Sequence, residues 1–118
     1  MKKIECIIRP SRLEAVKEAL GRYGIHGMTI TYVLGCGLQR GKTEYYRGSV
    51  YTINLLPKVK IEIITRDNWV AEIVEIISRE ARTGEIGDGK IFIYPIENTI
   101  RIRTGEQGEE AIYRIGVN

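Results

Sequence analysis

The chain has 118 residues, a formal net charge of +3, two widely separated cysteines and one histidine, which predicts a single domain and argues against a zinc site. Because the charge is balanced at 18 basic against 15 acidic residues, nucleic acid is disfavoured as a partner. The charged N-terminus and the absence of an apolar run of about 18 residues predict an intracellular, cytoplasmic protein without a membrane span.

The first third of the chain predicts a strand, a helix and a second strand. Ile4, Cys6 and Ile8 alternate with Glu5, Ile7 and Arg9 before Pro10, which is typical of a strand. Ser11 and Glu14 have the spacing of a helix capping box, and the following apolar stripe ends at Gly24. That stripe consists of Leu13, Val16, Leu20 and Tyr23. Residues 28–35 are rich in branched side chains and predict the second strand.

The second half repeats this order. Residues 59–65 alternate as a third strand, and a helix is expected from Asp67, with Trp69 anchoring its first turn. Its predicted core stripe is Val70, Ile73, Val74, Ile77 and Ala81, and its predicted exposed face carries Glu72, Glu75 and Arg79. Residues 91–94 predict a fourth strand. Residues 99–104 predict a short fifth, which would place Ile100 and Ile102 on one side and Arg101 and Arg103 on the other.

The element order predicts an α+β, ferredoxin-like fold over residues 1–118, in which a double βαβ plan forms a largely antiparallel sheet with both helices on one face. The opposite face would then expose apolar side chains such as Ile7, Ile64 and Phe92, so we expect oligomerisation to bury them. The polar, glycine-containing connection between Gly35 and Leu56 is much longer than the usual ~4–6 residues, which is typical of a functional or disordered loop.

Residues 84–90 have the glycine and lysine spacing of a nucleotide-binding P-loop. However, Ile91 replaces the required Ser or Thr, and a strand follows where a P-loop has a helix. The segment is therefore either an ordinary turn or a phosphate cradle of another kind. The paired arginines favour the cradle, because two neighbouring guanidinium groups repel unless an anion lies between them. Glycines at 84, 87 and 89 would let backbone N–H groups approach phosphate, and Lys90 adds a cation.

Three stretches resemble the PII nitrogen-signalling family: residues 46–51 with 56–63, residues 83–92 and residues 100–106. The resemblance covers nearly the whole chain and implies a homotrimer that binds ATP or ADP in clefts between subunits. It identifies residues 82–90 as the phosphate-binding B-loop and about 103–118 as a C-terminal loop. The ATP/ADP-binding residues that it implies are Ile7, Gly27, Met28, Thr29, Gly35, Gly37, Gln39, Ile64, Gly87, Asp88, Gly89, Lys90, Arg101 and Arg103.

The resemblance also implies that 2-oxoglutarate binds with Mg-ATP. Gln39 would ligate the Mg²⁺, Lys58 would pair with the distal carboxylate, and Gly41 and Gly87 would complete the site. Magnesium prefers about six oxygen ligands, which a keto acid, triphosphate oxygens and one amide oxygen can supply without a protein carboxylate.

Residues 37–55 would be the family's T-loop, which contacts target proteins. The implied targets are an ammonium transporter, nitrogen-assimilation enzymes or regulators, so a membrane would be met only through the transporter. Arg47 matches a residue that enters a transporter pore in relatives, and Tyr51 and Ser49 match positions that are uridylylated or phosphorylated in different branches. Each is also compatible with an ordinary exposed loop residue.

Two positions depart from the family pattern. Leu38 replaces an arginine that many relatives carry near the phosphates, and Cys36 replaces a phenylalanine. The apolar tail after Glu106 is expected to fold back near the nucleotide. The sequence shows no nucleophile with a base and an orienting group, so a ligand-gated adaptor is favoured over an enzyme. The alternatives are a PII-like paralogue that senses another small molecule and a small ferredoxin-like nucleotide-processing enzyme.

Overall fold

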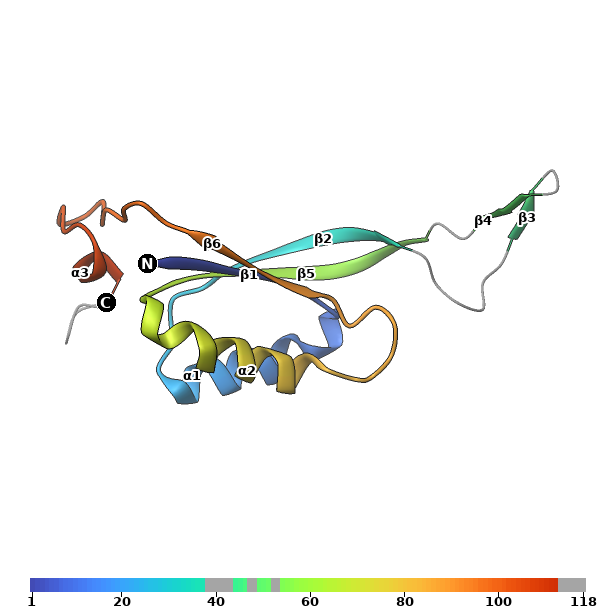
Figure 1. The fold of residues 1–118 in the computed structure, drawn as a ribbon, viewed down its shortest axis with the longest axis horizontal. Helices are drawn as coiled ribbons and strands as arrows, with labels where there is room; N and C mark the ends of the chain where they lie inside the picture. The colour runs from blue at the N-terminus through green and yellow to red at the C-terminus, as the bar shows by residue number, and fades with distance from the viewer. Residues whose placement is uncertain (38–43, 47–48, 52–53, 113–118) are drawn as a thin grey trace.

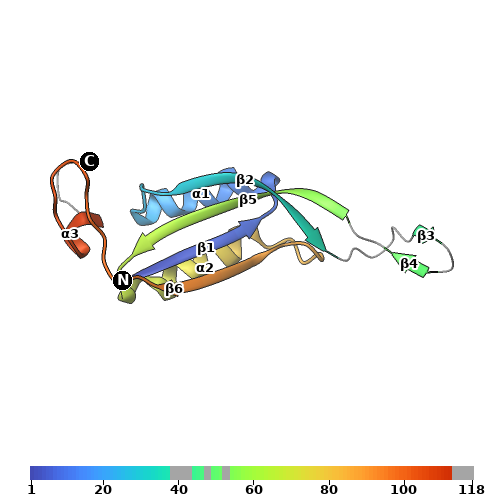
Figure 2. The same cartoon turned by 90° about the horizontal axis from the view of Figure 1, so that it is seen from above.

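The computed structural model describes the backbone of residues 1–37, 44–46, 49–51 and 54–112, and the side chains of 1–36 and 55–112. Four strands form one antiparallel sheet in the order β2-β5-β1-β6: β1 (Lys2–Ile8), β2 (Thr29–Gly37), β5 (Asn54–Thr65) and β6 (Lys90–Pro95). Two helices, α1 (Leu13–Tyr23) and α2 (Val70–Ala81), lie on one face of this sheet (Figures 1 and 2). The predicted α+β, ferredoxin-like fold is confirmed.

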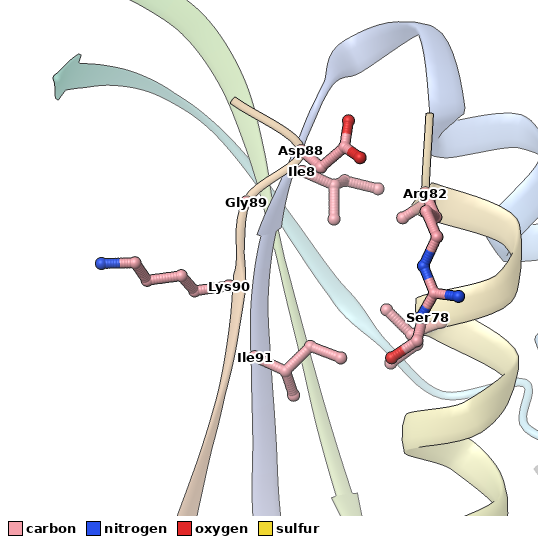
Figure 3. Close-up of a pocket in the computed structure, with 9 residues that line it drawn as sticks. Ile8, Ser78, Arg82, Asp88, Gly89, Lys90 and Ile91 are labelled. Atoms are coloured by element: carbon pink, nitrogen blue, oxygen red, sulfur yellow. The ribbon is translucent and has the colours of Figure 1, made fainter. Parts of the chain in front are cut away.

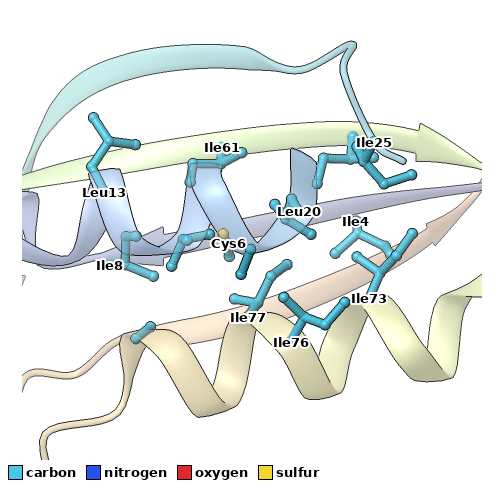
Figure 4. Packing of buried hydrophobic residues seen from close by; sticks show 14 of the residues in the cluster. Ile4, Cys6, Ile8, Leu13, Leu20, Ile25, Ile61, Ile73, Ile76 and Ile77 are labelled. Carbon is cyan, nitrogen blue, oxygen red and sulfur yellow. The ribbon is translucent and has the colours of Figure 1, made fainter. Parts of the chain in front are cut away.

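The core lies between the helices and one face of the sheet (Figure 4). Alternate residues of the two central strands point into it, because successive side chains of a strand face opposite ways. The fully buried large side chains include Ile4, Ile8, Leu20, Ile61, Ile63, Ile73 and Ile77. The ring centroids of Tyr23 and Trp69 lie 5.8 Å apart in an edge-to-face contact that joins the two helices. Trp69 therefore anchors the start of α2, as predicted.

The helix stripes agree with the sequence periodicity in most positions. Leu13, Val16 and Leu20 are buried on α1. On α2, Ile73, Ile77 and Ala81 are buried, Val70 and Val74 pack against the core, and Ile76 is an additional buried residue that the predicted stripe omitted. No helix in the described part of the chain combines the length and apolar character needed to cross a membrane.

The predicted capping box at Ser11 and Glu14 is wrong. A 3-10 turn over Pro10–Arg12 precedes α1, and no side chain caps either element. Pro10 occupies the first position of this turn, where its fixed φ is favourable and its missing N–H costs nothing. The expected end at Gly24 is confirmed, with φ +114° and its N–H donating to the carbonyls of Gly21 and Leu20.

The sheet face opposite the helices mixes charged and apolar side chains. The Lys3 ammonium lies 3.3 Å from Glu62 and 3.7 Å from Glu5. Ile7 and Ile64 are half-buried, and Phe92 is 40% exposed. The expected apolar side chains are therefore accessible on this face, but they are interspersed with charged side chains.

The long connection between the second and third strands of the main sheet is shorter than expected at both ends. Strand β2 continues to Gly37, and β5 already begins at Asn54 and pairs with it. Between them, β3 (Glu44–Tyr46) and β4 (Ser49–Tyr51) form a two-stranded antiparallel hairpin beyond the end of the main sheet (Figure 1).

The predicted fifth strand at residues 99–104 is wrong. Ile100 forms one isolated bridge with Gln107, and the chain then turns, with the Gly105 N–H donating to the Arg101 carbonyl at 2.8 Å. Gly105 and Gly108 adopt φ values of +82° and +70°, a left-handed conformation that ends strand pairing here. A short helix, α3 (Glu109–Ile112), follows.

Candidate functional site

A pocket of about 500 Å³ lies on the face of the sheet opposite the helices, where the ends of β1, β2 and β5 meet the loop before β6. The antiparallel register brings these segments together: Ile7 pairs with both Lys60 and Lys90, and Gly35 pairs with Leu56. The pocket is lined by Ile7, Gly35, Cys36, Leu56, Lys58, Ile86, Gly87, Gly89, Lys90 and Phe92. Six of the residues that the sequence predicted as ligand contacts therefore share one cavity: Ile7, Gly35, Lys58, Gly87, Gly89 and Lys90.

The loop over residues 83–88 is closed by the carboxylate of Asp88. This carboxylate accepts hydrogen bonds from the Thr83 hydroxyl, the Thr83 N–H at 2.8 Å and the Gly84 N–H at 2.9 Å. The bonds from Thr83, followed by those from Gly84 and Arg9, hold the pKa of the Asp88 carboxyl well below its usual range. Asp88, predicted as a nucleotide contact, thus uses its carboxylate to shape the loop.

Arg9 is a site residue that the sequence analysis missed. Its Nε lies 3.1 Å from Asp88 Oδ1, and its Nη2 donates to the Ile86 carbonyl at 2.8 Å. The position of Arg9 directly after β1 could have revealed it, because an antiparallel β1–β6 pair puts the end of β1 beside the loop that enters β6.

Two glycines allow the loop to approach the strands closely. Gly87 and Gly89 have φ values of +103° and +106°. A Cβ on Gly89 would overlap the Ile7 carbonyl oxygen, and one on Gly87 would lie 3.3 Å from Arg9 Nη2. Only glycine fits this backbone at residue 89 without displacing β1.

Lys58 connects β5 to the loop. Its ammonium donates to the Gly87 carbonyl at 2.6 Å. Burial, followed by the positive charge of Arg9, lowers the pKa of Lys58, while Asp88 opposes that shift. With Arg9, Lys58 and Lys90 around backbone N–H groups, the pocket is suited to an anion.

The other predicted nucleotide contacts lie away from this pocket. Thr29 pairs with Glu62 and Ile64 pairs with Lys3, toward the opposite end of the sheet. Ile64 lies six positions after Lys58 on β5, a distance of roughly 20 Å at the rise of a strand. Gly27, Met28, Arg101 and Arg103 also lie outside the pocket lining.

The predicted pairing of Arg101 and Arg103 on one strand face is wrong, because the chain turns between them. The Arg101 guanidinium is partly buried, donates to the Ala111 carbonyl at 3.0 Å and lies 3.9 Å from Glu106, whereas Arg103 is exposed. Helix α3 lies at the end of the molecule opposite the hairpin (Figure 1), so the described part of the tail lies away from the pocket of its own chain.

Several predicted residues fall outside the described structure. Leu38, Gln39, Gly41 and Arg47 are not described, and for Gly37, Ser49 and Tyr51 only the backbone is.

Comparison with known proteins gives a consistent result. The sequence profile described as "Nitrogen regulatory protein P-II" matches residues 1–106. The chain is 55% identical over 112 residues to the nitrogen regulatory protein P-II of Pasteurella multocida, an alignment that covers 95% of this chain and 100% of that protein. The identity is 58% to the corresponding protein of Nostoc punctiforme and 54% to that of Azospirillum brasilense, with the same coverage.

Proposed function

This chain belongs to the P-II family of nitrogen regulatory proteins, and from that premise we propose that it senses ATP or ADP together with 2-oxoglutarate. Its output is the control of nitrogen-metabolism proteins through residues 37–55. The observation that carries the proposal is the convergence of Ile7, Gly35, Lys58 and the 87–90 loop on one pocket.

The nucleotide site lies between copies of the chain. One copy supplies the pocket and its phosphate-binding loop, and a neighbour supplies the base-side residues and the arginines. The separation of roughly 20 Å along β5 between Lys58 and Ile64 supports this division, because one chain cannot bring both groups to one nucleotide. A cyclic homotrimer provides such a contact at every interface and also covers Ile7, Ile64 and Phe92.

The described residues fit a phosphate chain. Gly87 and Gly89 have the positive φ that turns backbone N–H groups toward an anion, and Lys90 lines the same cavity. The bound nucleotide supplies negative charge and magnesium-binding oxygens. The loop also contains a carboxylate, that of Asp88. Hydrogen bonds from Thr83 and Gly84 and the ion pair with Arg9 offset its negative charge and so reduce its repulsion of phosphate.

The 2-oxoglutarate site shares this pocket. Lys58 pairs with the distal carboxylate, Gly41 and Gly87 border the ligand, and Gln39 with ATP and the keto acid ligates Mg²⁺. The Lys58–Gly87 hydrogen bond links the carboxylate-binding lysine to the phosphate loop. Occupancy of either ligand can thereby influence the other.

The response is transmitted through the segment that joins β2 to β5. Gly35 and Cys36 lie near the end of β2, and Leu56 lies near the start of β5. All three line the pocket, and the β3–β4 hairpin lies between these two strands in the sequence. A ligand that moves these residues changes how the hairpin is presented to an ammonium transporter, an enzyme or a regulator. Arg47 contacts the partner, and Tyr51 or Ser49 offers a hydroxyl for modification.

Calorimetric titration tests the proposal. ATP and ADP are expected to bind without metabolite, and 2-oxoglutarate is expected to bind only when Mg-ATP is present. Lys58→Met should abolish 2-oxoglutarate binding and leave ATP binding nearly unchanged. Lys60→Met is the matched control, because Lys60 lies on the same face of β5 but outside the pocket lining.

Metabolite binding that is independent of ATP would contradict the shared site. Nucleotide binding without any 2-oxoglutarate response would instead indicate a relative that senses another small molecule, and it would direct attention to Leu38.

A further inference from the structure

A second cavity, of about 280 Å³, lies on the opposite side of the 88–91 segment from the pocket described above. It opens between the C-terminal end of α2 and strands β1 and β6, on the face of the sheet that carries the helices (Figure 3). The Lys90 side chain points away from this cavity, toward the other side of its strand (Figure 3). The two cavities are therefore back to back, with the backbone of Gly89 and Lys90 as a shared wall.

The inner surface of the second cavity is aliphatic. Ile8, Ile77 and Ala81 are buried core residues, and Ile91 packs partly against the core. Ile8 and Ile91 point from the sheet toward the α2 side (Figure 3). Because Ile8 and Ile77 are only 2% and 1% exposed, an aliphatic ligand group placed here would pack chiefly against the half-buried Ile91.

The rim supplies a charge without a counter-charge. Within the described part of the chain, the Arg82 guanidinium and the Ser78 hydroxyl have no hydrogen-bond or ion-pair partner. Both lie on the α2 side of the cavity (Figure 3). The nearby carboxylate of Asp88 does not neutralise Arg82, because it is held by Arg9, Thr83 and Gly84.

We propose that this cavity binds a small amphipathic monocarboxylate. The carboxylate accepts hydrogen bonds from Arg82 and Ser78, and the aliphatic part rests on Ile8, Ile77 and Ile91. A planar guanidinium matches a carboxylate in a two-bond geometry. The single cation on the rim, Arg82, favours one negative charge over the two of a phosphate, and the aliphatic inner surface favours a ligand with a hydrocarbon chain.

The shared wall makes this cavity a candidate regulatory site, an extension that depends on the function proposed above. Gly89 packs so closely on Ile7 that a side chain at residue 89 would overlap the Ile7 carbonyl. A ligand that shifts Gly89 from the helix side must therefore alter the phosphate-binding loop on the other side. Binding of the carboxylate and of nucleotide should be coupled, and the coupling must be reciprocal.

The test uses the full chain, ¹⁵N-labelled, with pentanoate as the probe and NMR amide shifts as the readout. Pentanoate is expected to shift the amides of Ser78, Arg82 and Ile91 in a saturable manner. Pentanamide and inorganic phosphate should each bind at least about tenfold more weakly, because one lacks the charge and the other the hydrocarbon chain. This experiment needs no nucleotide, so it stands or falls separately from the nucleotide proposal.

Arg82→Gln should weaken pentanoate at least about tenfold. Arg79→Gln is the matched control: Arg79 lies in the last turn of α2, three residues before Arg82, is 60% exposed and does not line the cavity. Ser78→Leu should block binding by filling the cavity, and thermal unfolding would check that this variant is folded. Regulation is measured as a change in the ATP dissociation constant on adding pentanoate, which Arg82→Gln should remove.

Absence of saturable shifts, equal binding of pentanoate and phosphate, or equal effects of the two arginine substitutions would each overturn the proposed site. Shifts centred on Gly35 and Lys58 would also overturn it, since the carboxylate would then occupy the other pocket. Pentanoate binding without any change in ATP affinity would refute the regulatory coupling.

Discussion

At the scale of single residues, Asp88 shows how a charged side chain can support a binding loop without facing the ligand. Its carboxylate accepts hydrogen bonds from Thr83, Gly84 and Arg9. These bonds hold the loop in its conformation without a ligand. A preorganised loop loses less conformational freedom when it binds an anion. Arg9 is consequently a positioning residue, and its replacement should affect the loop before it affects any ligand contact.

Asp88→Asn is expected to lower stability most at neutral pH. The pKa of Asp88 is depressed in the folded chain, so its contribution is complete above the unfolded-state value and is lost as pH falls through the lower folded-state value. The stability difference between wild type and variant should therefore be constant near pH 6 and shrink below about pH 4. Urea unfolding across this pH range measures it, and a difference that grows in acid would contradict the assignment.

Gly89→Ala is expected to destabilise the fold by more than about 1 kcal/mol and to weaken nucleotide binding, because the new methyl group overlaps the Ile7 carbonyl at a positive φ. Gly84→Ala is the matched control. Gly84 also has a positive φ, of +90°, but a Cβ there meets nothing within 4 Å. Denaturant unfolding of the two variants separates backbone strain from steric overlap, and equal losses would show that the overlap is relieved.

At the scale of secondary-structure elements, periodicity located the helices well and the C-terminal segment poorly. The stripes of α1 and α2 face a continuous core, so burial enforces the period that the sequence displays. Residues 99–104 alternate as a strand would, but within the described part of the chain their one β-pairing is the isolated bridge between Ile100 and Gln107. Gly105 and Gly108 redirect the chain instead, and Arg101 becomes a support for α3.

Ile73→Ala should cost about 2–5 kcal/mol of unfolding free energy, because a fully buried side chain on α2 leaves a cavity between helix and sheet. Glu75 lies two residues after Ile73 but is exposed, so Glu75→Ala should change the free energy of unfolding by less than about 0.5 kcal/mol. Urea denaturation compares them. If both variants lost a similarly small amount of unfolding free energy, α2 would not unfold cooperatively with the core, and the prediction would be wrong.

At the scale of the whole molecule, the two sets of predicted nucleotide contacts lie too far apart to serve one ligand in one chain. The pocket and loop are at one end of the sheet, and Thr29, Ile64 and α3 are toward the other. Assembly of identical chains is the arrangement that reunites them, and it also covers the apolar part of the open face.

Subunit mixing provides the test. Lys90→Ala and Arg103→Ala should each weaken ATP binding severely, because each removes a phosphate-binding cation from one side of the interface. When the two variants are unfolded and refolded together in equal amounts, roughly a quarter of the sites should combine two intact halves and regain normal affinity. The same mixture assembled from separately folded, unexchanged variants is the control. No recovery after exchange would contradict a site shared between chains.

The sequence by itself determined the order of the four strands and two helices of the main fold, most of the core stripes and the P-II family, because alternation, helical period and glycine-punctuated motifs are local signals. It also identified the glycines and lysines of the pocket. Only the tertiary structure showed that Arg9 holds the loop, that Asp88 turns inward, and that Arg101 supports α3. It also decided which predicted contacts share a pocket. These facts depend on which segments the antiparallel register places side by side, and that pairing joins residues distant in sequence through contacts that no local pattern records.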